Sequence, residues 1–128
     1  MSFPEGEFTI RNRASGRVLD VAYMSTEAGG SIIAWEFKGD DDNTNQRWKL
    51  DDGHLINIHS GLALSFNDIS HEAGATQEDA NGGEGQLFEY NDGIISLASN
   101  GDFVVGEWDG DVKLVNRDDY DDARRWDF

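Results

Sequence analysis

The chain has 128 residues, with 26 acidic and 10 basic side chains and a net charge of −16. Nucleic acids and anionic membranes bind to positively charged faces, so this balance argues against both as partners. The sequence contains no cysteine, which excludes disulfide and thiolate chemistry and favours a reducing compartment. Its first residues lack the basic and then apolar run of a signal peptide, and we therefore expect a cytoplasmic protein.

The first 53 residues predict four short strands. Residues 7–12 alternate apolar and polar side chains with the period of a strand, and residues 17–21 follow after a turn. Residues 31–37 are rich in β-branched and aromatic side chains, and residues 47–50 form the last predicted strand. Fifteen glycines and a single proline fit many tight turns between such strands.

The rest of the chain repeats this plan twice. Strands are predicted at residues 55–58 and 62–66, but residues 76–79 show no apolar alternation and predict only a poor third strand. In the last third of the chain, strands are predicted at residues 94–97, 103–107, 111–115 and 126–128. Asp109-Gly110 is a typical hairpin turn between two of them. No segment shows a helical stripe.

A large aromatic residue marks the same place in each copy, at Trp48, Phe88 and Trp126, spaced by 40 and then 38 residues. A unit that cannot bury its own apolar face must share a core with its copies. Four strands in each of three units predict an all-β fold, a β-trefoil with pseudo-threefold symmetry, in which these three rings are equivalent core anchors. We expect one domain over residues 1–128, with repeats at about 7–53, 54–93 and 94–128. A three-bladed propeller would leave too little to fill its centre.

The residues before these rings carry a family resemblance. Residues 46–48 read Gln-Arg-Trp, a complete Gln-x-Trp motif, residues 86–88 are a conservative variant, and residues 124–126 keep only the aromatic ring. With the strand plan, this resembles the ricin B chain family of carbohydrate-binding β-trefoils over residues 8–128. The short, cysteine-free chain is similar to the single-domain lectins of mushrooms and other fungi.

The resemblance implies a lectin without catalytic activity, cofactor or metal, which binds glycans of the galactose or N-acetylgalactosamine type. Its partners would be glycoproteins or glycolipids, and a homodimer is possible. The family's usual role implies a cytoplasmic protein of defence.

Galactose recognition requires a carboxylate that accepts from two neighbouring hydroxyls, an aromatic ring that covers the sugar's C–H face, and an amide. In the family the carboxylate ends the second strand, the ring lies on the third, and the amide precedes Gln-x-Trp. In repeat one these places hold Asp20, Trp35 and Asn45. Phe37, two residues beyond Trp35, is a second candidate for the ring. Gln46 is included in the site and is expected to hydrogen-bond the fold, or to orient Asp20, more than to touch the sugar.

The candidate residues also have structural interpretations. Asp20 could cap a turn, Trp35 could belong to the core, and Asn45 could be a turn residue. In repeats two and three the counterparts of Asp20 are Ser65 and either Val105 or Gly106.

Trp35 and Phe37 correspond by counting to Ala75 and Gln77 in repeat two, and to Lys113 and Val115 in repeat three. The counterparts of Asn45 are Gly85 and Ala123. The sequence therefore predicts a single sugar site, in repeat one.

Other features are assigned to the surface. The acidic runs at residues 40–42 and 118–122 lack the spacing and glycine of a calcium loop and are expected to form a solvated face. His54, His59 and His71 lack metal-ligand spacing and are predicted to be surface residues, so no metal site is expected. Trp108 and Tyr120 are predicted to be exposed rings that could extend a glycan site or form a dimer contact.

Alternative functions remain. The chain could be a β-trefoil protease inhibitor, or a lectin that binds a different glycan through repeat three. The many carboxylates do not support a glycosidase, because among 26 acidic residues some pair always lies at a suitable distance, and nothing in the sequence resembles an acid with a raised pKa in an apolar pocket.

Overall fold

The structure is a computed structural model that describes residues 2–39 and 42–128. Short strands and single turns of 3-10 helix alternate along these residues. Repeat one contains β1 (Glu7–Phe8), β2 (Arg11–Asn12), β3 (Val18–Val21), η1 (Ala22–Met24), β4 (Ile32–Trp35), η2 (Thr44–Gln46) and β5 (Trp48–Asp51). Repeat two contains β6 (His54–Asn57), β7 (Ala63–Ser65), β8 (Ala73–Gly74), β9 (Thr76–Glu78), η3 (Glu84–Gln86) and β10 (Phe88–Asn91). Repeat three contains β11 (Ile94–Leu97), β12 (Phe103–Trp108), β13 (Asp111–Asn116), η4 (Asp122–Arg124) and β14 (Trp126–Asp127).

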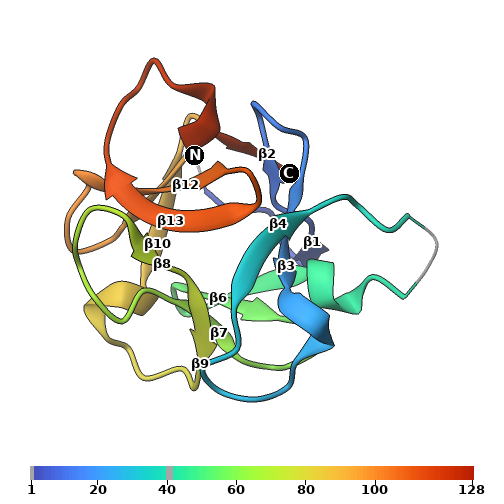
Figure 1. The fold of residues 1–128 in the computed structure, drawn as a ribbon. Coiled ribbons are helices and arrows are strands. Elements are labelled where there is room, and N and C mark those ends of the chain that lie inside the picture. Colours follow the sequence, from blue (N-terminus) through green and yellow to red (C-terminus); the bar gives the residue numbers. More distant parts are fainter. Residues whose placement is uncertain (1, 40–41) are drawn as a thin grey trace.

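The three repeats occupy three sectors around one centre (Figure 1). All pairs of neighbouring strands are antiparallel, and they form one sheet in the order β1-β5-β6-β7-β9 and a second that runs from β10 through β11, β12, β13, β4, β3 and β2 to β14. The predicted all-β architecture, a β-trefoil, is confirmed. No helix in the described part of the chain is both long and apolar enough to cross a membrane.

Asp-Gly pairs close three hairpins of the fold. Both residues have positive φ at Asp52-Gly53, Asp92-Gly93 and Asp109-Gly110, as a type I′ turn requires. These turns join β5 to β6, β10 to β11, and β12 to β13. The first two hairpins cross the predicted repeat boundaries, so repeats two and three each begin with a strand that pairs with the last strand of the repeat before it.

The predicted anchors meet in the core. Trp48, Phe88 and Trp126 are buried in one hydrophobic cluster with side chains from all three repeats. The indole Nε1 of Trp48 donates to the carbonyl oxygen of Leu19 at 3.2 Å, and that of Trp126 donates to Val105 at 2.8 Å. Leu19 and Val105 are therefore equivalent, and the residues that follow them, Asp20 and Gly106, occupy the same position.

The third strand of repeat two forms in spite of its weak pattern. β9 pairs with β7 through Leu64↔Gln77 and Ser65↔Thr76. Gln77 takes the inward position and is fully buried. Its amide nitrogen donates to two carbonyl oxygens of repeat one, Ser25 at 3.0 Å and Glu27 at 2.9 Å, and these bonds replace the apolar contact that the periodicity rule expects.

The strand register corrects the counterparts of Trp35. Trp35 pairs with Val18, and the equivalent third-strand residues are Glu78, opposite Ala63, and Val115, opposite Val104. The counterparts that the sequence predicted for this ring, Ala75 and Lys113, are wrong, because they were counted back from Phe88 and Trp126 and the loops between the third strand and this anchor differ in length among the repeats.

Candidate functional site

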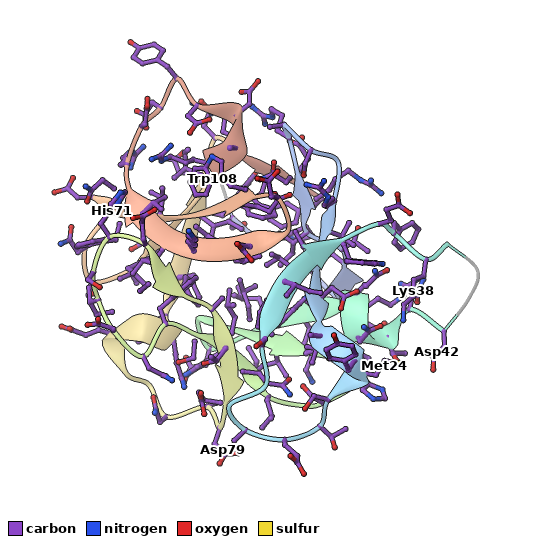
Figure 2. All side chains as sticks on the ribbon, in the orientation of Figure 1. Met24, Lys38, Asp42, His71, Asp79 and Trp108 are labelled. Carbon is purple, nitrogen blue, oxygen red and sulfur yellow. The ribbon has the colours of Figure 1, made fainter. Side chains whose placement is uncertain are left out.

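A cavity of about 460 Å³ opens in repeat one, beside β3, η1 and β4. We call it the repeat-one pocket. It is lined by Asp20, Ala22, Tyr23, Met24, Ser31, Ile33, Trp35, Lys38 and Asn45. Figure 2 shows the labelled Met24 and Lys38 on one side of the molecule, and His71 and Trp108 on the other. Three of the five residues predicted for sugar binding, Asp20, Trp35 and Asn45, are brought together here.

Asp20 is the third residue of β3, which is buried along its whole length, and Asp20 itself is only 5% exposed. Its Oδ1 accepts from Asn45 Nδ2 at 3.1 Å, and its Oδ2 accepts from Gln46 Nε2 at 2.9 Å. Burial raises the pKa of the Asp20 carboxyl, and the hydrogen bond from Gln46 and the nearby charge of Lys38 partly oppose that rise. Because a carboxylate can accept about four hydrogen bonds, Asp20 keeps capacity for ligand hydroxyls.

Gln46 is fully buried and does not line the pocket. Besides Asp20, its amide nitrogen donates to the Glu36 carbonyl oxygen at 2.8 Å, and its oxygen accepts from the Lys38 backbone N–H at 3.0 Å. Gln86 makes the same pair of backbone bonds in repeat two, to Asp79 and Asn81. Gln46 therefore ties the chain beyond β4 to η2, and in repeat one it also orients the carboxylate.

Asn45 is 3% exposed and combines a satisfied donor with an unsatisfied acceptor. Its Nδ2 donates to Asp20 and to the carbonyl oxygen of Val21, both at 3.1 Å. Its Oδ1 is buried without a hydrogen-bond partner among the described residues. A buried acceptor that lacks a partner is costly, and a ligand hydroxyl in the adjoining pocket can supply the missing donor.

The rings predicted for stacking separate in the structure. Trp35 is 58% exposed and lines the pocket, so it is not a core residue. Phe37 lies beyond the end of β4 and outside the pocket lining, where its ring lies 5.8 Å from the guanidinium carbon of Arg11. The chain leaves β4 after Trp35, so the strand alternation that would have put both rings on one face does not continue.

Tyr23 was not among the predicted site residues. Its ring is fully exposed, and it lines the pocket from η1, whereas Trp35 lines it from β4. The signal was an aromatic residue three positions after the predicted carboxylate. Tyr23 and Met24 both have positive φ, at 57° and 53°, and this conformation turns the chain away from β3. Tyrosine and methionine rarely adopt it, so the sequence did not indicate this turn.

Repeat two lacks the ligand groups. Ser65 replaces Asp20, and its hydroxyl donates to Asn67 Oδ1 at 2.9 Å. Gly85 stands at the position of Asn45, and a Cβ there would lie 1.9 Å from the Phe66 carbonyl oxygen. The backbone therefore leaves no room for an amide side chain at this position.

Repeat three fills the equivalent space with its own side chain. Gly106 replaces Asp20, and a Cβ there would lie 2.7 Å and 2.9 Å from two ring carbons of Trp108. The Arg124 guanidinium carbon lies 4.9 Å from the centre of the Trp108 ring. Trp108 is thus half-buried, and its predicted exposure is wrong, whereas Tyr120 is fully exposed as predicted.

The described residues contain no group of three or more His, Cys, Asp or Glu side chains placed to hold a metal ion. Residues 40 and 41 of the first acidic run lie outside the described residues. Two of the histidines predicted at the surface are not fully exposed: His54 is buried and His59 is half-buried.

A family model described as "Ricin-type beta-trefoil lectin domain-like" matches residues 2–54, the segment that contains every lining residue of the repeat-one pocket. The solution structure of the mdaA-1 domain has a TM-score of 0.89 at 26% identity, over 99% of this chain and 91% of that one. The resemblance to ricin-type β-trefoil lectins is confirmed.

Two further proteins resemble this chain, one over most of its length and one over about half of it. The earthworm R-type lectin C-half, solved with GalNAc, has a TM-score of 0.81 at 21% identity over 96% of both chains, which shows a shared fold. Mucoricin from Rhizopus delemar is 43% identical over 61 residues. This match spans 47% of the present chain and 41% of Mucoricin.

Proposed function

We propose that the protein is a non-catalytic lectin that binds terminal galactose or N-acetylgalactosamine through the repeat-one pocket. The observation that carries this proposal is the unpartnered Oδ1 of buried Asn45 beside the Asp20 carboxylate, in a cavity that also presents the exposed ring of Trp35. Asp20 supplies an anionic hydrogen-bond acceptor, Asn45 supplies a neutral acceptor, and Trp35 supplies a flat apolar surface.

These groups fit the surface of one hexose. Two neighbouring hydroxyls donate to the Asp20 carboxylate, and another hydroxyl or an acetamido N–H donates to Asn45 Oδ1. Galactose leaves one C–H face open because its 4-hydroxyl is axial, and the Trp35 indole covers that face. A single sugar held in this way should bind with millimolar to high micromolar affinity, on the order of 4 to 6 kcal/mol.

The comparisons support the proposal at the level of the fold. The family model covers the segment with the pocket, and an earthworm lectin of the same fold was solved with GalNAc. The proposed recognition uses hydrogen bonds and one ring, so it requires neither a metal ion nor a catalytic pair of carboxylates. We further propose that the partners are glycans of glycoproteins or glycolipids, and that the protein resides in the cytoplasm, because it lacks cysteine.

Isothermal titration calorimetry tests the sugar class. Methyl β-galactoside and N-acetylgalactosamine should bind the wild type, and methyl β-glucoside, whose 4-hydroxyl is equatorial, should bind much more weakly. Asp20→Asn should abolish binding of both ligands with the fold intact by circular dichroism. Equal binding of glucoside and galactoside, or normal binding by Asp20→Asn, would overturn the proposal. A glycan array then identifies the preferred linkage.

A further inference from the structure

Two walls of the repeat-one pocket are built from turns whose conformation needs support. η1 carries Tyr23 and Met24 with positive φ, a region that non-glycine residues rarely occupy. η2 carries Asn45, whose amide nitrogen donates to Asp20. Neither turn has the long backbone ladder that holds a strand, so other groups must keep the two walls in place.

His59 of repeat two contacts both walls. Its Nε2 lies 3.1 Å from the Met24 carbonyl oxygen, and its Nδ1 lies 3.3 Å from the hydroxyl oxygen of Thr44, the residue before Asn45. A carbonyl oxygen only accepts, so Nε2 must donate to Met24. The imidazole therefore spans the distance between η1 and η2.

The far partner of His59 is itself anchored. The backbone N–H of Thr44 donates to Asp42 Oδ1 at 3.3 Å. The Thr44 hydroxyl lies 2.9 Å from Asp42 Oδ1 and 3.3 Å from His59 Nδ1, and its single proton is donated to one of these two acceptors at a time. His59 does not line the pocket and is half-buried behind it. Its position allows it to affect the ligand groups only through the two turns.

The equivalent turns of the other repeats carry no such ring. The backbone N–H of Ile58 donates to the Arg47 carbonyl oxygen, and those of Arg13 and Ala98 make the same bond to Arg125 and Leu87. The residues that follow them are His59, Ala14 and Ser99, which makes these three equivalent. An alanine or a serine is too short to bridge two neighbouring turns. The imidazole thus stands in the one turn that adjoins the pocket with Asp20 and Asn45.

We propose that His59 is a positioning residue of the repeat-one pocket, which sets the separation of the η1 and η2 walls and thereby the affinity for the glycan. A ligand binds with an apparent affinity reduced by the fraction of molecules in the competent arrangement. Loss of the His59 bridge lowers that fraction without removing any ligand contact. This inference rests on the proposed sugar site. It means that repeat one supplies the groups that line the pocket and repeat two supplies a residue that positions them.

Three substitutions at one position test the bridge. The amide of Gln reaches the place of imidazole Nε2 and can donate to Met24, whereas the shorter amide of Asn reaches the place of Nδ1 and serves only Thr44. Loss of one ordinary hydrogen bond predicts that His59→Ala weakens methyl β-galactoside binding about three- to tenfold. His59→Gln should bind like the wild type, and His59→Asn should resemble His59→Ala. His71→Ala is the matched control and should bind normally, because His71 lines a second cavity, which contains Trp108 and shares no lining residue with the repeat-one pocket.

A second measurement needs no ligand. The Ser25 backbone N–H donates to the Ala22 carbonyl oxygen and closes η1. Hydrogen exchange at the Ser25 amide should be faster in His59→Ala than in the wild type, with His59→Gln restoring protection and Leu114 in β13 unaffected. Unchanged exchange at Ser25 in His59→Ala would overturn the inference, as would unchanged sugar binding by His59→Ala when the wild type binds, or equal affinities of the Gln and Asn variants.

The failure of the proposed function looks different. In that case wild type and Asp20→Asn show the same titration with every sugar, although Ser25 exchange still responds to His59→Ala. If instead the wild type binds, Asp20→Asn does not, and His59→Ala binds normally, the sugar site stands and only the bridge is wrong.

Discussion

Gln46 Nε2 donates to Asp20 Oδ2 at 2.9 Å, across 26 residues of sequence. The same amide donates to the Glu36 carbonyl oxygen, so one side chain connects the fold motif to the candidate ligand carboxylate. Repeat two keeps the backbone bonds of this glutamine in Gln86 but has Ser65 in place of the carboxylate. This difference separates the structural role of the motif from its role in the site.

Substitution of the two glutamines should therefore have different effects. Gln46→Ala and Gln86→Ala each leave buried backbone groups without partners, and each should lower the free energy of unfolding by about 1 to 3 kcal/mol in urea titrations. Only Gln46→Ala should also weaken sugar binding, because only it releases a carboxylate. Equal sugar affinities of the two variants would show that Gln46 does not orient Asp20.

The three repeats should be functionally unequal. A hydrogen bond to a charged group contributes roughly 1.5 to 3 kcal/mol, and Asp20→Ala removes the acceptor for two hydroxyls. Binding should become undetectable by calorimetry, whereas Ser65→Ala should bind like the wild type. The wild type should show one site per chain. A stoichiometry of two or three would direct attention to the cavity that contains Trp108.

Trp35 and Phe37 form a matched pair of exposed rings. Trp35→Ala should weaken binding by about tenfold or more, since the sugar face loses its apolar cover. The free energy of unfolding of Trp35→Ala should differ from that of the wild type by less than about 0.5 kcal/mol, because the side chain is on the surface. Phe37→Ala should leave binding unaltered, since that ring lies by Arg11. A stronger effect from Phe37→Ala than from Trp35→Ala would reverse the assignment.

Binding should be lost in acid at a pH above the ordinary pKa of an aspartic acid. Burial raises the pKa of Asp20, so the carboxyl takes up its proton at a higher pH in the folded protein than in the unfolded chain. The protonated group can no longer accept from two hydroxyls. The affinity should fall as the pH decreases through this raised pKa, measured by titration at several pH values.

Stability should respond to pH with the opposite sign. A raised pKa in the folded state means that protonation of Asp20 stabilises the fold below the unfolded pKa, and that this contribution is lost as pH rises through the folded pKa. The free energy of unfolding of the wild type, relative to Asp20→Asn, should therefore decrease with rising pH in that window. A difference that does not vary with pH would contradict the raised pKa.

Chelators should leave the affinity unchanged. The candidate site contains hydrogen-bonding groups and a ring, and the acidic residues 118–122 lie in repeat three, away from the pocket lining. Titration of methyl β-galactoside with and without EDTA measures this directly. Loss of binding in EDTA that calcium restores would place an acidic loop in the site.

The sequence by itself determined the repeat, the fold and three residues of the candidate site. Core anchors such as Trp48 recur at a regular interval because three equivalent units share one centre, and that interval can be read without coordinates. Asn45 was predicted because it stands three residues before that anchor with no variable loop between them, and Asp20 because it lies at the end of the second predicted strand of repeat one.

Tertiary structure alone decided which other groups enter the pocket. Trp35 faces solvent and Phe37 lies elsewhere because β4 ends between them, which depends on backbone pairing and not on residue type. Tyr23 and Met24 adopt positive φ, against their local preference, where His59 and Gln77 of repeat two hold η1 and the loop after it. Contacts between residues 35 and 52 positions apart leave no periodic trace in a sequence, so only the folded chain shows that His59, a histidine predicted at the surface, contacts both η1 and η2.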